Sequence, residues 1–193
     1  MNFLNPKIIL FIACFLLFGS CSKKDENKSV EDSESSSLIQ AKDLQIDKNG
    51  LSKARVVIKT AHGNIVFKFY PMKATGTVTR FIQLTNEGFY DGLKFHRVVP
   101  NFVVQGGDPL GTGMGGSGVK LKAEFNNVQH VKGTVAMARS EDPNSADSQF
   151  YIALTTLPSL DGKYTVFGQV VEGLDLLEKI QIGDKMISVV FER

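Results

Sequence analysis

The chain has 193 residues, of which 42% are hydrophobic, so it is long enough to bury one core but short for two domains. It carries 22 basic and 20 acidic residues, and this nearly neutral balance argues against a domain that binds nucleic acid or a charged membrane surface. Both cysteines, Cys14 and Cys21, lie near the N-terminus, which excludes disulfides, cysteine metal ligands and a cysteine nucleophile from the rest of the chain.

Residues 1–20 have the pattern of a secretory signal peptide. Lys7 precedes the apolar run "IILFIACFLLFG", which is too short to span a bilayer as a helix. Two small residues then precede Cys21, and "LFGSC" resembles the lipobox of bacterial lipoproteins, whose cysteine is acylated and becomes the first mature residue. We expect lipidation at Cys21. The alternatives are lipidation at Cys14, which only six apolar residues precede, or a plain signal peptide or uncleaved anchor with an incidental cysteine.

Residues 21–52 are predicted to be a disordered tether that carries the lipid. The segment "SKKDENKSVEDSESSS" contains one apolar residue, Val30, among many charges and serines, and such a composition cannot offset the entropy lost on ordering. We therefore expect an exported protein that contacts the membrane only through its N-terminal lipid. Its expected location is the bacterial cell envelope at the outer membrane, on the periplasmic face or at the cell surface.

Residues 53–193 are predicted to form the globular domain, which begins with a β-hairpin. "ARVVIKT" and "IVFKFY" are rich in β-branched and aromatic residues, and the turn "AHGN" joins them. The segment from Thr75 to Glu87 is predicted to be a helix, with Gly88 at its C-terminal cap. Its apolar residues recur at i, i+3 and i+4: Val78, Phe81 and Ile82.

The remaining strands are predicted to follow with few helices between them. The candidates are "KFHRVV", "FVVQGG", "TVAMAR", "QFYIAL", "YTVFGQVV" and "KMISVVFE". A second short helix is predicted from Gly173 to Ile180, because leucine and isoleucine recur there at helical spacing. This order indicates a mainly β domain built on an antiparallel sheet or barrel.

A glycine pattern, GxGxxG, occurs at Gly111, Gly113 and Gly116. A dinucleotide site needs these glycines to turn from a strand into a helix, whose N-terminus faces the pyrophosphate. Here "SGVKLKAEF" follows, and its alternation indicates extended chain instead. The glycines are better explained by tight turns in a long loop that lies against a neighbouring groove, or simply by a flexible surface loop.

No motif for hydrolysis or metal binding is present. "GGSGV" breaks the GxSxG spacing, and the three histidines lack the spacing of metal ligands, so we expect neither a metal nor a cofactor. Arg97 and Gln105 do not transfer protons readily, so any chemistry there is electrostatic. His96 is predicted to be a hydrogen-bonded structural histidine.

A longer series of motifs resembles the cyclophilin family of peptidyl-prolyl isomerases. "FHRVVPNFVVQGGDP", "GTGMGGSG", "GTVAMARSEDPNSADSQFYIAL", "LDGKYTVFGQVVEGLD" and "GDKMISVVFER" follow in order from about Val56 to Arg193. The resemblance implies a closed antiparallel eight-stranded β-barrel capped by two α-helices. It also implies that the domain catalyses rotation about Xaa-Pro peptide bonds.

The resemblance assigns a site residue by residue. Arg97, Phe102 and Gln105 match the catalytic positions of the family. The residues that match its substrate pocket and adjoining groove are Val103, Gly113, Ala138, Arg139, Ser140, Gln149, Tyr151, Leu160 and Tyr164. The sequence departs from the family at several points, most of all at Ser159, where the best-known members carry tryptophan, and at Tyr151, where they carry phenylalanine.

The implied function is a monomeric folding enzyme of the cell envelope. Its partners would be proline-containing polypeptides that are unfolded or partly folded. Arg97 would stabilise the twisted amide by a hydrogen bond, with no covalent step. The alternative is a proline-peptide-binding or holdase module with little isomerase activity, and the presence of both Arg97 and Gln105 argues against it.

Overall fold

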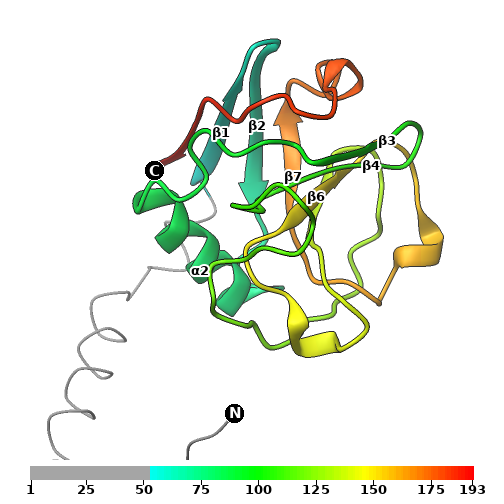
Figure 1. Cartoon of the computed structure of the whole chain (residues 1–193). Coiled ribbons are helices and arrows are strands. Elements are labelled where there is room, and N and C mark those ends of the chain that lie inside the picture. The colour runs from blue at the N-terminus through cyan, green and yellow to red at the C-terminus, as the bar shows by residue number, and fades with distance from the viewer. Residues whose placement is uncertain (1–52) are drawn as a thin grey trace, which may run out of the picture. The chain divides into compact units, whose positions relative to one another are not determined.

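The computed structural model describes residues 53–193 (Figure 1). Eight strands form one antiparallel sheet in the order β3-β4-β6-β5-β7-β2-β1-β8, and the sheet curls into a half-barrel. The predicted mainly β fold and the number of strands are therefore confirmed. The predicted signal peptide, residues 1–20, and the predicted tether, residues 21–52, lie outside the described residues.

The chain enters the sheet through the predicted hairpin. Strand β1 (Arg55–Thr60) pairs with β2 (Gly63–Phe69), so that Val56 faces Phe67 and Ile58 faces Ile65 across the ladder. These four side chains are fully buried, because alternate residues of each strand point into the core. The period-two pattern of the sequence thus sets which face of the hairpin is inside.

The other six strands continue the sheet on both sides of this hairpin. They are β3 (Arg97–Val99), β4 (Val103–Gly106), β5 (Thr134–Met137), β6 (Phe150–Ala153), β7 (Val166–Glu172) and β8 (Ser188–Glu192). Single turns of 3₁₀ helix occur at η2 (Pro143–Ser145), η3 (Pro158–Leu160) and η4 (Leu177–Lys179). Strand β6 lies between β4 and β5, and this places the segments around residues 103–106, 134–138 and 150–153 side by side.

The prediction of a closed barrel is wrong, because the first and last strands of the sheet do not pair with each other. Strands β3 and β8 are the two edges of the sheet, and no ladder joins them in the described part of the chain. Only the segments before these strands meet. Phe95 N–H donates to the carbonyl of Asp184 at 2.8 Å, and Gly183 N–H donates to the carbonyl of Phe95 at 2.9 Å. Strand β3 has only three residues and pairs with β4 alone, so the curl stays open.

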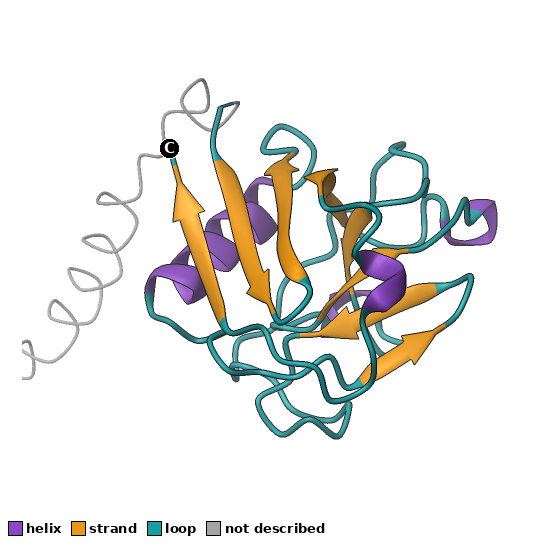
Figure 2. Cartoon of the chain, turned by 90° about the horizontal axis from the view of Figure 1, so that it is seen from above, coloured by secondary structure: helices purple, strands orange, loops and turns teal. Residues whose placement is uncertain are grey.

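The predicted first helix is confirmed as α2 (Thr75–Asn86), and Figure 2 shows it beside the strands at the C-terminal end of the chain. Its N-terminal residue has no side-chain cap of its own. Instead the carboxylate of Glu124, from a distant loop, accepts the backbone N–H groups of Gly76 at 2.9 Å and Thr77 at 2.8 Å. A negative charge at this end also complements the helix dipole.

Aromatic side chains fill the space between α2 and the sheet. Phe81 of the helix meets Phe67 and Phe150 edge to face, with ring centroids 5.6 Å and 5.4 Å apart. Phe167 and Tyr90 complete this cluster, and all five rings are at most 2% exposed. Edge-to-face pairs add about 0.5 to 1.5 kcal/mol each beyond the area that they bury. This is the main core of the domain.

The second predicted helix, Gly173 to Ile180, is wrong. The segment forms only the single 3₁₀ turn η4. Gly173 has a positive φ of 81° and its backbone lies against Asn64, so the chain makes a turn there rather than beginning a helix. The tight turn is enough to bury Leu177 and Ile180, which explains the helical spacing of the apolar residues without a helix.

Alternation along β4, β5 and β6 creates a second, smaller apolar cluster on the outer face of the sheet. Val104, Val135 and Ile152 point into the main core. The residues next to them in these strands point the other way and pack together with Leu157 and Val166. The buried members of this outer cluster are Val103, Ala136, Tyr151, Ala153, Leu157 and Val166, and aromatic side chains such as Phe102 and Tyr164 pack against them. An apolar cluster on the outside of a sheet is a place where a ligand can bind.

Candidate active site

A pocket of about 320 Å³ lies over this outer cluster. Strands β3 and β4 supply one side, β6 the floor, and η3 with the loop after it the other side. Its lining residues are Arg97, Phe102, Val103, Gln105, Ala138, Arg139, Tyr151, Leu160 and Tyr164. The structure therefore brings together nine of the twelve residues that the sequence assigns to the site, although up to 67 positions separate them in the chain.

A line of polar side chains crosses the rim of the pocket. Arg97 Nη1 donates to Gln105 Oε1 at 3.2 Å, and Gln105 Nε2 donates to Gln149 Oε1 at 2.9 Å. Gln149 Nε2 in turn donates to the carbonyl oxygens of Gly113 and Gly115. The direction of these bonds fixes both amide groups, because an amide oxygen accepts and an amide nitrogen donates. Gln105 and Gln149 are thus held in one orientation.

Arg97 is one of two charged residues that line the pocket, the other being Arg139. Arg97 is exposed, its guanidinium carbon lies 5.7 Å from the centre of the Phe102 ring, and it forms no ion pair with any of residues 53–193. Its register places it opposite Gln105 in the β3–β4 ladder. A guanidinium has five N–H donors and remains protonated, so donors of Arg97 not used on Gln105 can bind a ligand.

Two tyrosines form much of the apolar wall. Tyr151 projects from β6 and is 5% exposed, and its ring meets that of Tyr164 edge to face at 5.7 Å. Burial, followed by the neighbouring Tyr164, raises the pKa of Tyr151 well above the ordinary value, so its hydroxyl stays protonated. Leu160 of η3 and Val103 of β4 add aliphatic surface. This wall suits a small apolar ring.

A second cavity of about 340 Å³ adjoins the first and shares Gln105, Ala138 and Arg139 with it. It contains the remaining predicted residues, Gly113, Ser140 and Gln149. Sequence reasoning did not assign five further lining residues: Met114, Gly115, Ser145 and Asp147, which lie within the motifs quoted for the resemblance, and Lys120, which lies outside them. All twelve predicted residues therefore line one of two neighbouring cavities, and their roles remain predictions.

Arg139 forms the wall between the two cavities. Its guanidinium donates to the carbonyl of Lys163 through Nε and Nη2, and to those of Ser140 and Glu141 through Nη1. The same group lies over the Tyr164 ring, 4.9 Å from its centre. On its other side the guanidinium carbon lies 5.5 Å from the centre of the Phe125 ring. Four hydrogen bonds and two ring contacts hold this long side chain in place, so it has a structural part in shaping the groove.

Two buried carboxylates hold the glycine-rich loop that borders the second cavity. Asp108 accepts the backbone N–H groups of Leu110 at 2.8 Å, Thr112 at 2.9 Å and Gly113 at 2.5 Å. Burial raises the pKa of Asp108, but these donors together with Gly115 N–H outweigh it and hold the pKa below its usual value. The loop is therefore fixed and is not the flexible loop that glycine content alone allows.

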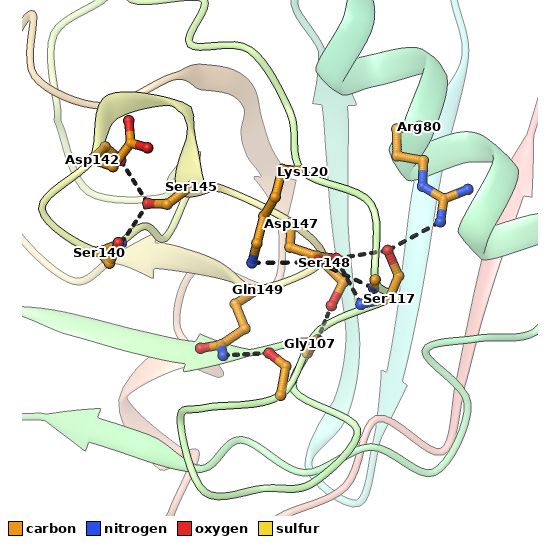
Figure 3. A network of polar contacts seen from close by, with 12 residues as sticks. Arg80, Gly107, Ser117, Lys120, Ser140, Asp142, Ser145, Asp147, Ser148 and Gln149 are labelled. Atoms are coloured by element: carbon orange, nitrogen blue, oxygen red, sulfur yellow. Dashed lines mark hydrogen bonds and ion pairs between the residues drawn. The ribbon is translucent and has the colours of Figure 1, made fainter.

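Asp147 holds the second half of the same loop, as Figure 3 shows. It accepts Ser117 N–H and Ser117 Oγ, both at 2.6 Å, while Arg80 of α2 donates to that hydroxyl at 3.0 Å. A Cβ at Gly116 would lie 2.6 Å from the Asp147 carboxylate, so only glycine fits. The predicted reason for the glycines, close approach to neighbouring structure, is confirmed here.

We expect Asp108→Ala to lower the free energy of unfolding by about 1.5 to 3 kcal/mol, the usual contribution of hydrogen bonds to a charged group. Because the folded pKa lies below the ordinary 3.8, this stabilisation is present above that pH and is lost as pH falls through the folded pKa. Denaturant unfolding at neutral and acidic pH measures it. Asp142→Ala is the control, since that exposed carboxylate accepts only the Asn144 N–H; equal losses for both variants would contradict the prediction.

His96 is not the hydrogen-bonded histidine that the sequence predicted. Both ring nitrogens are buried, and neither has a hydrogen-bond partner among residues 53–193. Burial lowers the pKa of His96, so the ring is neutral near pH 7. The ring lies beside the glycine-rich loop, where a Cβ at position 113 would come within 4.0 Å of His96 Cδ2.

No group of three or more His, Cys, Asp or Glu side chains in residues 53–193 has the arrangement needed to hold a metal ion. Within the same range, no helix has the length and apolar character required to cross a bilayer.

Known proteins that resemble this chain do so over most of residues 53–193. The family model described as cyclophilin type peptidyl-prolyl cis-trans isomerase/CLD matches residues 55–190. A peptidyl-prolyl cis-trans isomerase of Helicobacter pylori is 44% identical over 155 residues, which cover 78% of this chain and 94% of that protein. Isomerase B of Bacillus subtilis is 47% identical over 127 residues, covering 65% of this chain and 88% of the relative.

A solved structure agrees with these relatives. The cyclophilin type isomerase of Cryptosporidium parvum, crystallised in the presence of the dipeptide Ala-Pro, superposes with a TM-score of 0.67 at 29% identity. The match covers 72% of this chain and 99% of that protein. The family model covers more than half of the chain, and the fold is consistent with it. The chain belongs to the cyclophilin family and is a peptidyl-prolyl cis-trans isomerase.

Proposed function

We propose that the chain isomerises Xaa-Pro bonds of exported proteins at the bacterial cell envelope, and that Arg97 lowers the barrier by binding the twisted amide. The observation that carries this proposal is the position of Arg97. Its guanidinium lies at the edge of an apolar pocket without a carboxylate partner in the described residues, and Gln105 holds one of its nitrogens.

The chemistry requires no covalent step. An Xaa-Pro bond resists rotation with a barrier of about 18 to 20 kcal/mol because twisting breaks amide resonance. A turnover of milliseconds needs about 5 to 7 kcal/mol less. In the twisted state the proline nitrogen regains its lone pair and can accept a hydrogen bond. A fixed guanidinium that donates there binds the twisted state more tightly than either planar state, and such differential binding accelerates the reaction.

The rest of the pocket would hold one end of the substrate while the other end turns. Phe102, Tyr151 and Leu160 would enclose the proline ring, and the oriented amide of Gln105 would bind the peptide backbone. The Ala-Pro dipeptide present with the Cryptosporidium parvum relative supports a proline-containing ligand for this groove. A pocket of about 320 Å³ is large enough for a single proline ring with its neighbouring peptide groups.

The test is a protease-free measurement of cis/trans exchange in a proline peptide by NMR exchange spectroscopy. We expect exchange to accelerate in proportion to enzyme concentration, and a Phe102→Ala variant to bind the peptide more weakly. Peptide binding without faster exchange would instead identify a holdase or peptide-binding module. If the peptide neither binds nor exchanges faster, the proposal is refuted.

We further propose that Cys21 is acylated and is the mature N-terminus, which would hold the domain at the outer membrane through residues 21–52. The support is the order of features in the sequence: a basic residue, an apolar run, two small residues and then cysteine. The acyl chains would supply the attachment to the membrane.

In cells, Cys21→Ser should move the protein from the detergent phase to the aqueous phase on detergent partitioning. The matched control is Cys14→Ser, which changes the other cysteine of the same segment and should leave partitioning unchanged. Mass spectrometry of the N-terminal peptide should show acyl chains on Cys21. A mature chain that begins elsewhere, or equal behaviour of both variants, would contradict lipidation at Cys21.

A further inference from the structure

A buried histidine contacts two of the residues that line the pocket of about 320 Å³, Tyr151 and Tyr164. His130 is fully buried, and its Nε2 lies 2.9 Å from the hydroxyl of Tyr151. Its Nδ1 lies 2.8 Å from Asp161 Oδ1, and the same oxygen accepts the backbone N–H of His130 at 2.7 Å. We refer to these three residues, Asp161, His130 and Tyr151, as the hydrogen-bond chain.

The direction of the hydrogen-bond chain follows from its end groups. Two hydrogen bonds from His130, one from its backbone N–H and one from its ring, lower the pKa of Asp161, so this side chain is a carboxylate and can only accept. Nδ1 must therefore carry a proton. Nε2 forms the second hydrogen bond, with the Tyr151 hydroxyl at 2.9 Å. Each ring nitrogen then has one partner, and the Tyr151 hydroxyl is held against the ring.

The hydrogen-bond chain connects the floor of the pocket with one of its sides. Tyr151 belongs to β6, whereas Asp161 directly follows η3, whose last residue is Leu160. Tyr151 and Leu160 both line the pocket. The His130 ring also lies parallel to that of Tyr151, with centroids 6.0 Å apart, and meets Tyr164 edge to face at 6.4 Å. His130 thus contacts the pocket residues Tyr151 and Tyr164, and its hydrogen bond to Asp161 connects it to the η3 turn that carries Leu160.

We propose that His130 is a positioning residue of the isomerase: through Asp161 and the Tyr151 hydroxyl, it sets the separation of the pocket walls that enclose the substrate's proline. This inference rests on the proposed role of the pocket. Tyr151 encloses the ring in the planar and in the twisted state alike. Loosening it should therefore weaken substrate binding and leave the rotation step nearly unchanged, which raises KM and not kcat.

A double-mutant cycle on Tyr151→Phe and Asp161→Ala tests the proposal. Each single variant should raise KM by about threefold to tenfold, the range that corresponds to a hydrogen bond in a protein, with kcat within about twofold. The double variant should have the KM of Tyr151→Phe alone, because without the hydroxyl the chain has nothing left to position. Asp161→Asn should restore the wild-type KM, since its amide oxygen still accepts from His130.

The matched control is Asp184→Ala. Asp184 also accepts a histidine ring nitrogen, from His62 at 2.8 Å, and a backbone N–H, from Gln181 at 2.8 Å, but it lines neither cavity. It should leave KM unchanged. Thermal unfolding of every variant shows whether it is folded.

If the factors by which the two single variants raise KM multiply in the double variant, their free energies are additive and the proposal is overturned, because Asp161 then acts on η3 independently of Tyr151. An unchanged KM for Tyr151→Phe would overturn it as well, and that variant alone decides if Asp161→Ala does not fold. If the pocket itself does not bind the substrate, Phe102→Ala will also leave substrate binding unchanged. This result distinguishes failure of the proposed function from failure of the role proposed for His130.

Discussion

Replacing Arg97 by alanine is expected to lower kcat/KM by about tenfold or more while the domain stays folded. A hydrogen bond to a charged donor contributes about 1.5 to 3 kcal/mol, which corresponds to about 10- to 150-fold in rate when the bond forms mainly in the transition state. The side chain is exposed at the rim of the pocket and makes a single hydrogen bond, to Gln105, so its removal leaves no buried group without a partner.

The control for this prediction is Arg55→Ala. Arg55 is also an exposed strand arginine, but it pairs with Glu192 at 2.7 Å at the opposite edge of the sheet, far from the pocket in strand order. This variant should keep wild-type turnover. If Arg97→Ala has wild-type kcat/KM in a correctly folded protein, Arg97 does not have the proposed role.

Cyclosporin, the ligand after which the family is named, is expected to inhibit this isomerase weakly. Ser159 stands where sensitive members of the family carry a tryptophan against the bound drug. Burial of a large apolar side chain contributes about 1.5 to 3 kcal/mol and a neutral hydrogen bond about 0.5 to 1.5 kcal/mol. Loss of both amounts to about 1.5 to 3 orders of magnitude in affinity.

An inhibition titration of wild type beside Ser159→Trp measures this difference. Ser159 is exposed on η3 and its side chain lines neither cavity, so tryptophan can be introduced there without disturbing the core. The tryptophan variant should bind the drug more tightly, with turnover close to that of wild type. Equal inhibition of the two proteins would show that Ser159 does not correspond to that wall of the drug site.

The local parts of the fold were predictable because their signals are local. The hairpin β1–β2 and the helix α2 each follow from the spacing of apolar residues within about a dozen positions. The same rule failed from Gly173 to Ile180, where a 3₁₀ turn buries the same residues. Spacing of apolar residues reports which side chains are inside and does not by itself distinguish one turn from three.

The closure of the sheet and the polar framework of the site required three-dimensional information. Residues of the pocket were found because the sequence resembles a known family over most of its length. Asp147 and His130 were not, because their partners are distant: Ser117 precedes Asp147 by 30 positions, and Asp161 follows His130 by 31. Such contacts have no sequence spacing of their own, since they arise only when β5, β6 and the loops pack together.

We propose that Arg97 acts on the rotation step and not on binding. The most direct measurement is the rate of cis/trans exchange of a saturating proline peptide bound to wild type and to Arg97→Ala, with the dissociation constant of each measured by titration. The predicted result is an exchange rate on the enzyme that falls by about tenfold or more, with dissociation constants that agree within about threefold. Equal exchange rates on the two enzymes, or a loss confined to the dissociation constant, would contradict it.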